Sequence, residues 1–516
     1  MSFAVRLLFP IDRLIAALVD PARRERTVIG VLTAYVVLWT FTGTLIKANQ
    51  DIHYDMAGVA AWSRELALGY PQHPPLAPWL VRGWFNVFPV ADWSYYLLGM
   101  ACAGIALWCA WRVFARFLQD EVRVLALALL TLVPFYNFHA LKFDHNVVLL
   151  PLWAATTLWF VRSFETRTAG WAVLAGAGAA AAMLAKYWSI YLLAGLALAA
   201  LIDSRRGAYF RSAAPWVTVT VGALLIAPNI AWLMANDFEP MHYAVGVHTP
   251  ASFGATVRSV AGYLAGTAGY AALPILLILT VSRPTLAALQ DVLKPQEPAR
   301  RFAATAFWTP LLLPAVVVLA TGLELNPVWS ISGFTLLPVV LLSSPLISVS
   351  QTATRAMVTL AVVIPPLMAV AAPGLAIVNH RTGAITPTAA HGRLLAQKVE
   401  QEWRRISDQP LRLIGGDLDL ANVVAFYLPD RPSTFPVSEP QLAPWANDER
   451  IVRDGIAIVC HATGSLCTHR LVEVPTEAIE ARGPPGHRLS VEIARTFLGI
   501  AGPPAGYVIV TVPPHR

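Results

Sequence analysis

Ionisable side chains gather in residues 49–79, NQDIHYDMAGVAAWSRELALGYPQHPPLAPW, a polar stretch between two long apolar runs. Asp51 and Asp55 are four residues apart, so on a helix both carboxylates would lie on one face, about one turn apart. A carboxylate at such a position can take the proton from an incoming hydroxyl. The alternative is a solvated loop in which an aspartate caps a helix, and this stretch alone does not decide between the two.

A second set of ionisable side chains recurs where later apolar runs end. It consists of Lys142, Asp144 and His145 in FHALKFDHN, Lys186 in LAKYWS and Asp237 in ANDFEP. Taken singly, these residues have ordinary explanations, such as a lysine that extends to the membrane surface or an aspartate that ends a helix. Ionisable groups at the edge of the hydrocarbon are costly unless they are paired or used, so their coincidence predicts a functional site.

A mixture of cations and carboxylates suits a particular chemistry. An anionic lipid phosphate needs cationic groups, and activation of a hydroxyl needs a base. We therefore predict that Lys142 and Lys186 neutralise the phosphate of a leaving group and that Asp55 or Asp51 accepts or orients the proton. The expected substrate-binding residues are the neighbouring histidines and aspartates: His53, His73, Asp144, His145 and Asp237.

The same residues could instead bind a divalent cation as a cofactor. Two carboxylates with nearby histidines can hold such an ion, although no spacing here is diagnostic of a metal site. Nucleotide-binding and metalloprotease signatures are absent from the sequence, which contains no P-loop, no GxGxxG and no HExxH. These patterns favour a donor that is delivered by the membrane.

The composition identifies the elements that must position these residues. Of 516 residues, 56% are hydrophobic and 13% are charged, against about 25% charged in soluble domains. This composition indicates a polytopic α-helical membrane protein. About eleven apolar runs are candidate membrane spans, namely residues 28–46, 93–111, 124–138, 147–161, 171–185, 189–202, 216–234, 260–281, 302–321, 328–346 and 357–378.

The basic residues predict the orientation of these spans. The net charge of +7 would suit nucleic acid, but most arginines fall in alternate loops, as the positive-inside rule requires when the N-terminus is cytoplasmic. We therefore expect a bilayer and no nucleic acid as partner. A short interfacial helix is predicted at the N-terminus. The loops assigned to the outer side hold few basic residues: Lys47, Arg64, Arg82, Lys142, Lys186 and Arg258.

The sequence divides into two predicted domains. Residues 1–378 form the membrane domain, with a first outer loop at 47–92, and an odd number of spans places residues 379–516 outside. In this tail, AAHGRLLAQKVEQEWRRIS predicts an amphipathic helix, while LRLIGG, GIAIVC and YVIVTV predict strands of a small α/β domain. Cys460 and Cys467 would pair in an oxidising exterior, or remain as two free thiols.

The residues quoted above, with GYPQHPPLAPWL and APNIAWLMANDF, resemble the polyprenyl-phosphate-sugar-dependent glycosyltransferases of the GT-C class. Within this class they are most similar to the bacterial branch of the protein O-mannosyltransferase superfamily, family 39-like. That branch includes the aminoarabinose and galacturonic acid transferases of lipid A and lipopolysaccharide core. The likeness covers residues 34–238 well, whereas the later spans and the tail match only in layout.

The resemblance implies transfer of a sugar from a polyprenyl phosphate to a lipid, polysaccharide or protein acceptor at the periplasmic face of a bacterial inner membrane. It implies an essential aspartate at Asp55 and phosphate contacts at Lys142 and Lys186. The family usually has a glutamate directly after this aspartate, where this chain has Met56. A transporter or flippase is the main rival, and Met56 also keeps open an inactive assembly protein. The sugar and the acceptor are not specified by these residues.

Overall fold

The computed structural model describes residues 3–463, 466–468 and 487–514. Two compact units make up the chain. Unit 1 comprises Met1–Thr42 and Tyr96–Ala369, and unit 2 comprises Gly43–Tyr95 and Val370–Arg516. The chain passes from one unit to the other within α2 (Arg24–Ile46), α5 (Asp92–Phe114) and α17 (Gln351–Arg381).

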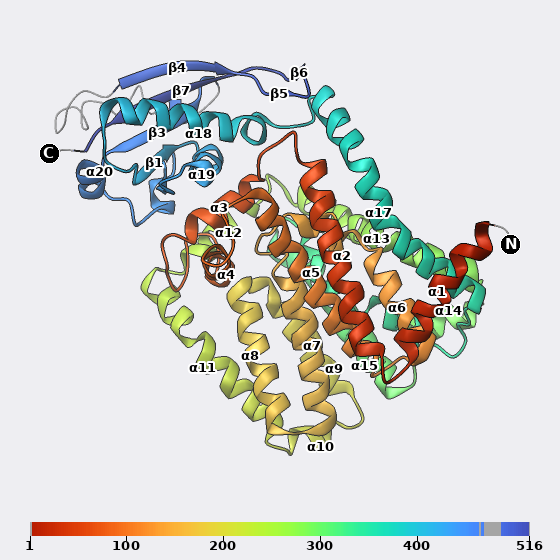
Figure 1. Cartoon of the computed structure of the whole chain (residues 1–516). Coiled ribbons are helices and arrows are strands. Elements are labelled where there is room, and N and C mark those ends of the chain that lie inside the picture. The colour runs from red at the N-terminus through yellow and green to blue at the C-terminus, as the bar shows by residue number, and fades with distance from the viewer. Residues whose placement is uncertain (1–2, 464–465, 469–486, 515–516) are drawn as a thin grey trace. The chain divides into compact units, whose positions relative to one another are not determined.

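Unit 1 is built almost entirely of helices (Figure 1). An interfacial helix was predicted at the N-terminus, and α1 occupies that segment. Besides parts of α2, α5 and α17, the described helices of this unit are α1 (Phe3–Val19), α6 (Asp120–Thr131), η1 (Pro134–Tyr136), η2 (His139–Leu141), α7 (Leu149–Thr166), α8 (Ala169–Ala185), η3 (Tyr187–Ser189), α9 (Ile190–Ile202), α10 (Arg206–Phe210), α11 (Ala214–Ala235), α12 (Glu239–His248), α13 (Phe253–Ser282), α14 (Leu286–Leu293), α15 (Pro298–Thr321), η4 (Pro327–Leu336) and α16 (Leu337–Leu342).

The predicted polytopic membrane architecture is confirmed, but the count of eleven spans is not. Among the described residues, six helices are long and apolar enough to cross a membrane, and a seventh span results if α6 and the following Pro134–Leu141 segment are counted together. The predicted runs at 171–185, 189–202 and 328–346 form shorter helices. The run at 147–161 forms α7, which has 18 residues but is not among the six helices that pass this test. The apolar runs therefore predicted helices, and the number of complete crossings stays a prediction.

Close packing in unit 1 depends on small residues of α8. This helix lies against α7 and α11. A Cβ on Gly176 would come within 3.0 Å of the Val221 side chain of α11, and a Cβ on Gly178 would come within 2.9 Å of Trp159 of α7. Small side chains let helix backbones approach closely in membrane proteins. The sequence AGAGAAAA thus fixes α8 between its two neighbours.

A break after α6 positions the first of the predicted site segments. The helix axis turns by 81° between Asp120–Thr131 and Pro134–Leu141. The carbonyls left free at the break are satisfied by side chains: Asn137 Nδ2 donates to the Thr131 and Val133 oxygens at 3.0 and 3.2 Å. The Tyr35 hydroxyl contacts the Thr131 oxygen at 3.3 Å and the Tyr136 oxygen at 3.0 Å. Such pairing is required where a helix is interrupted at membrane depth.

Unit 2 contains a mixed five-stranded sheet with the order β2-β1-β3-β7-β4 (Figure 1). Strand β1 is parallel to β2 and β3, whereas β7 is antiparallel to β3 and β4. The predicted small α/β tail domain is therefore confirmed. Its described elements are α18 (Pro387–Ile406), β1 (Leu413–Gly416), α19 (Leu418–Tyr427), β2 (Ser433–Pro436), η5 (Pro440–Leu442), α20 (Asp448–Asp454), β3 (Ile456–His461), β4 (His487–Ile493), β5 (Thr496–Phe497), β6 (Ile500–Ala501) and β7 (Ala505–Val512).

Both faces of this sheet are covered, because strand residues alternate between two cores. Ala457 and Val459 of β3 join one core with the apolar faces of α18 and α19, while Ile456, Ile458 and Cys460 join the other. The predicted pairing of Cys460 with Cys467 is present as a disulfide with a Cα–Cα distance of 5.7 Å.

The first outer loop belongs to unit 2. It contains α3 (Tyr54–Trp62) and α4 (Leu76–Phe85), and α3 packs against α19 of the tail. Unit 2 therefore includes this loop as well as the tail, and the predicted domain boundary at residue 378 stays a prediction. The loop carrying Asp51 and Asp55 folds together with the α/β tail.

Candidate active site

Lys142 and Lys186 are linked in unit 1 by a short polar chain. Lys142 Nζ lies 3.6 Å from Asp144 Oδ2, and Asn146 Nδ2 donates to the same oxygen at 3.2 Å. The Asn146 side-chain oxygen then accepts a hydrogen bond from Lys186 Nζ at 2.6 Å. We call Lys142, Asp144, Asn146 and Lys186 the lysine cluster. It places two cations within one connected network, as binding of a phosphate requires.

The local fold explains why these side chains meet. Asp144 is 5% exposed, and its Oδ1 accepts hydrogen bonds from the backbone N–H groups of Asn146 and Val147 at 2.8 and 3.0 Å, which caps the turn leading into α7. Lys186 terminates α8, where its backbone turns to an extended conformation. The carboxylate of Asp144 is thus held by backbone and is available to orient Lys142.

Aromatic rings border Lys186. Its Nζ lies 5.1 Å from the centroid of the Trp329 ring, which meets His248 edge-on at 4.9 Å. A cation over a tryptophan face is electrostatically favourable. Burial and the positive charge of Lys186 lower the pKa of His248. The lowered pKa disfavours a second positive charge beside the lysine.

Two other predicted substrate-binding residues of unit 1 are placed differently. His145 is buried, with 4% exposure, in the same turn as Asp144. Asp237 is exposed in the turn between α11 and α12, where its φ of 48° is left-handed. The structure shows neither hydrogen bond nor ion pair between Asp237 and the four described residues of the lysine cluster. His145 therefore lies beside Asp144 of the lysine cluster, whereas Asp237 lies in a different turn, between α11 and α12.

Asp55 lies in the first turn of α3 in unit 2. The N-cap of this helix is His53, whose Nδ1 accepts the backbone N–H of Asp55 at 3.1 Å. His53 Nδ1 also lies 3.6 Å from Asp55 Oδ2. The Asp55 side chain is 39% exposed. Asp55 is therefore an accessible carboxylate on a well-defined helix start.

Three acidic side chains of the tail surround the same region. The pKa of Asp419, in the first turn of α19, is raised to about 6 by partial burial and then by the negative charges of Asp55, Asp417 and Glu439. Gly416 has a φ of 144°, which allows β1 to end directly before Asp417, the N-cap of α19. The sequence GGDLD thus places a second carboxylate close enough to interact with Asp55.

Asp51 has a different environment from Asp55. It is 2% exposed, and its Oδ2 accepts the backbone N–H of Arg393 in α18 at 2.9 Å. Its Oδ1 forms an ion pair with Arg495 Nη2 and lies 3.7 Å from Arg393 Nε. Arg393 in turn binds Asp92 at 2.7 Å. The Asp51 carboxylate is therefore fully engaged by the tail, which suits it to hold the loop rather than to accept a proton.

The proline-rich turn around His73 is fixed by hydrogen bonds. The Tyr70 hydroxyl bonds the Glu65 oxygen at 2.7 Å, and the backbone N–H of Tyr70 donates to the His73 oxygen at 3.0 Å. Trp62 stacks on Tyr70 at 5.5 Å and meets the His73 ring at 5.8 Å. His73 thus lies in a packed turn that shapes the loop following α3.

The donor atoms around Asp55 are carboxylate oxygens and one imidazole, which suit a hard divalent cation. Among the described residues, however, only Asp417, Cys460 and Cys467 have three potential ligand atoms within mutual reach. Both of these sulfurs are bonded to each other in the disulfide. The geometry therefore defines no metal site, and a divalent cation remains an open prediction.

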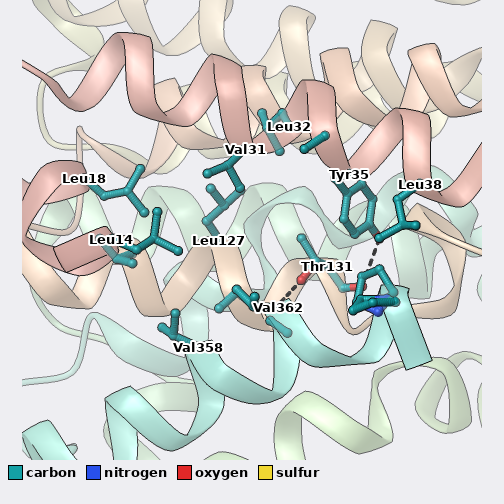
Figure 2. Close-up of a pocket in the computed structure, with 16 residues that line it drawn as sticks. Leu14, Leu18, Val31, Leu32, Tyr35, Leu38, Leu127, Thr131, Val358 and Val362 are labelled. Carbon is teal, nitrogen blue, oxygen red and sulfur yellow. Dashed lines mark hydrogen bonds between the residues drawn. The ribbon is translucent and has the colours of Figure 1, made fainter. Parts of the chain in front are cut away.

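An apolar groove of about 310 Å³ lies in unit 1 between α1, α2, α6 and α17 (Figure 2). Figure 2 shows leucine and valine side chains from these helices around it, with the Tyr35 ring at one end. The Tyr35 hydroxyl is already bonded to backbone oxygens. The groove thus presents almost only hydrocarbon, and a lipid chain can lie in it without leaving a polar group unsatisfied.

Some residues of the site carried no clear sequence signal. Arg393 and Arg495 bind Asp51 from segments far along the chain, and nothing in their local sequence indicated this. Asp419 did have a signal, because an acidic GGDLD motif follows a strand, but it was not among the predicted site residues. Trp329, in LELNPVW, was likewise outside that set.

The fold matches that of two solved structures of ArnT. The chain superposes on the crystal structure of ArnT from Cupriavidus metallidurans bound to undecaprenyl phosphate with a TM-score of 0.62 at 13% identity, over 94% of this chain and 97% of ArnT. The apo form of ArnT gives a TM-score of 0.59 at 12% identity, over the same shares of both chains. At these identities the likeness establishes the GT-C-like fold.

The sequence comparisons agree with this class. Residues 72–232 match the family model described as dolichyl-phosphate-mannose-protein mannosyltransferase. The lipid A galacturonosyltransferase RgtD of Rhizobium johnstonii is 25% identical over 232 residues, which are 45% of this chain and 47% of RgtD. The lipopolysaccharide core galacturonosyltransferase RgtB of the same organism is 27% identical over 218 residues, 41% of this chain and 43% of RgtB. The chain thus matches less than half the length of these curated relatives. The resemblance to glycosyltransferases that was inferred from the sequence is confirmed by these matches.

Proposed function

We propose that the protein is an integral-membrane glycosyltransferase that moves a sugar from a polyprenyl-phosphate donor to a lipid or polysaccharide acceptor. The observation that carries this proposal is the lysine cluster, set at the break of a membrane helix in an ArnT-like fold. RgtD and RgtB, which act on lipid A and lipopolysaccharide core, support galacturonic acid as the first sugar to test.

In the proposed reaction an acceptor oxygen attacks the anomeric carbon of the sugar, and the bond from this carbon to the donor phosphate breaks. Lys142 and Lys186 bind the phosphate and stabilise the negative charge that develops on it as it leaves. Asp55 takes the proton of the acceptor hydroxyl, which its partial exposure allows. One displacement of this kind inverts the configuration at the anomeric carbon.

Asp51 is proposed as a positioning residue. Arg393 of α18 and Arg495, which follows β4, fix the start of the loop to the tail, four residues before Asp55. Loss of one partner from a buried ion pair leaves an uncompensated charge, which is strongly destabilising. His53 caps the helix that carries Asp55 and thereby sets the direction of its side chain.

The apolar groove is proposed to hold part of the polyprenyl chain. Its lining is aliphatic, and burial of apolar surface provides affinity in rough proportion to area. The head group would then be oriented by the lysine cluster. We further propose that the enzyme resides in a bacterial inner membrane with its N-terminus in the cytoplasm and its α/β tail in the periplasm, as the distribution of basic residues predicts.

Lysine variants test the phosphate role. With a radiolabelled polyprenyl-phosphate galacturonic acid donor in membranes, Lys186→Met should lower transfer by about 100-fold, because one charge-stabilising donor to the leaving group is lost. Lys186→Arg should keep a measurable rate, since the charge remains. The matched control is Lys294→Met at an exposed helix end, which should transfer at the wild-type rate. Wild-type transfer by Lys186→Met would refute the assignment.

A further inference from the structure

A second pocket of unit 1, of about 270 Å³, is lined largely by arginines and is separate from the apolar groove. It is formed where α2, α6 and α8 begin and where α5 and α7 end. We call this pocket the arginine pocket. The helix ends and the turn after α5 contribute its lining residues, namely Arg24, Glu25, Arg112, Ala115, Arg116, Arg123, Leu158, Arg162 and Trp171. None of these residues takes part in the proposed sugar transfer.

Arg123 is the most deeply placed cation of the pocket. Its side chain is 6% exposed, its guanidinium stacks 3.5 Å from the centroid of the Trp111 ring, and its Nε donates to the Trp111 backbone oxygen at 3.0 Å. No carboxylate of the described part of the chain forms an ion pair with it. A guanidinium has five N–H donors, so Arg123, which lines the pocket, retains further donors besides the one bonded to Trp111.

The surrounding charges do not balance. Glu25 lies 3.7 Å from Arg112, and Glu165 lies 2.8 Å from Arg116 and 3.8 Å from Arg162. Five arginines against these two carboxylates leave a surplus of three positive charges at one pocket. Like charges held close together are destabilising unless an anion lies between them. The pocket is therefore built for a multiply hydrogen-bonded anion.

The position of the pocket points to an anion from the bilayer. Three of its helices, α2, α5 and the bent α6 segment, are apolar enough to span a membrane, and the arginines lie where these helices end. Trp171 lines the pocket and Trp108 lies 5.6 Å from the Arg112 guanidinium carbon, which is the interfacial placement that tryptophan prefers. Arginine forks bind phosphate through paired N–H groups.

We propose that the arginine pocket binds the phosphodiester head group of an anionic phospholipid in the surrounding bilayer. The helix ends that form it belong to the side predicted to be cytoplasmic, so the lipid comes from the inner leaflet. This binding does not depend on the proposed transferase activity. It would anchor the ends of five helices to one lipid head group.

Lipid binding by the purified full chain tests the proposal. Native mass spectrometry in detergent would measure retention of phosphatidylglycerol, with phosphatidylcholine as the neutral lipid. The wild type should bind phosphatidylglycerol selectively, and a variant with Arg112→Gln and Arg116→Gln should bind it at least about tenfold more weakly, because each basic group near the surface contributes about 1 kcal/mol. This variant leaves the buried Arg123 and its packing in place.

The control is Arg211→Gln, an exposed arginine between α10 and α11 that does not line the pocket. It should bind phosphatidylglycerol as the wild type does. Equal weakening by Arg211→Gln, or unchanged binding by the double variant, would overturn the proposal. A parallel titration with inorganic phosphate identifies the source of the anion, because displacement of the lipid by equimolar phosphate would show a soluble anion site instead.

Discussion

At the scale of single residues, the chain supplies the second acidic group near Asp55 from an unexpected place. Met56 occupies the position where the resembling family usually has a glutamate. Asp419, far along the chain in α19, has a pKa that is raised first by burial and then by the negative charge of Asp55. The acidic character of the site is thus partly restored by the tail domain.

The raised pKa of Asp419 predicts a pH-dependent stability. Between the ordinary aspartate pKa of 3.8 and about 6, the folded chain holds a proton at Asp419 that the unfolded chain has lost. Stability therefore decreases as pH rises through this window and stays low above it. Asp419→Asn removes the penalty, so it should raise the melting temperature at pH 7.5 and have a smaller effect at pH 4.5.

Thermal unfolding in detergent at both pH values checks this prediction. Asp408→Asn, an exposed aspartate of the same unit, is the matched control and should leave the melting temperature unchanged. An equal effect of Asp419→Asn at the two pH values would contradict the raised pKa of Asp419.

At the scale of elements, apolar runs predicted where helices form better than whether each crosses the membrane. Residues 124–138 were predicted as one span, but the helix ends at Thr131 and turns by 81° at the Pro134 segment. Pro134 favours such a break because it lacks a backbone N–H. Asn137 favours it because its side chain donates to the freed carbonyl oxygens of Thr131 and Val133. Hydrophobicity alone does not carry this information.

Packing of α8 makes a prediction at the same scale. Gly176→Ala would place a Cβ 3.0 Å from the Val221 side chain and 3.1 Å from the Gly222 nitrogen. Because this is overpacking against backbone, the free energy of unfolding should fall by about 1–3 kcal/mol. Gly170→Ala in the same helix meets no atom within 4 Å and should not destabilise. Melting temperatures of the two variants in detergent provide the comparison, and equal values would contradict the α8–α11 contact.

At the scale of the whole molecule, the class of fold was predictable from the sequence, whereas the long-range contacts of the first outer loop were not. Composition identified the membrane helices, and short apolar runs identified β3 and β7 as buried strands. The loop of Asp51 and Asp55 joins the tail through long-range pairs such as Asp51 with Arg495, which are separated by 444 residues. Local patterns cannot report such contacts, so the sequence analysis placed this loop with the membrane helices.

A test of Asp55 as the base must distinguish an effect of the substitution on the reaction from an effect on folding. Asp51 is buried in ion pairs, so Asp51→Asn should lower the melting temperature as well as transfer. Asp55 is partly exposed, so Asp55→Asn should leave the melting temperature close to that of the wild type. The two aspartates are thereby distinguished by stability before any transfer is measured.

The measurement that tests the central claim most directly is transfer of radiolabelled sugar from a polyprenyl-phosphate donor in membranes that contain wild-type chain or Asp55→Asn at equal abundance. The account predicts that label reaches a lipid or polysaccharide acceptor with the wild type and not with Asp55→Asn. Equal transfer by both chains would remove Asp55 from the chemistry, and no transfer by the wild type with any donor of this class would contradict the proposed function itself.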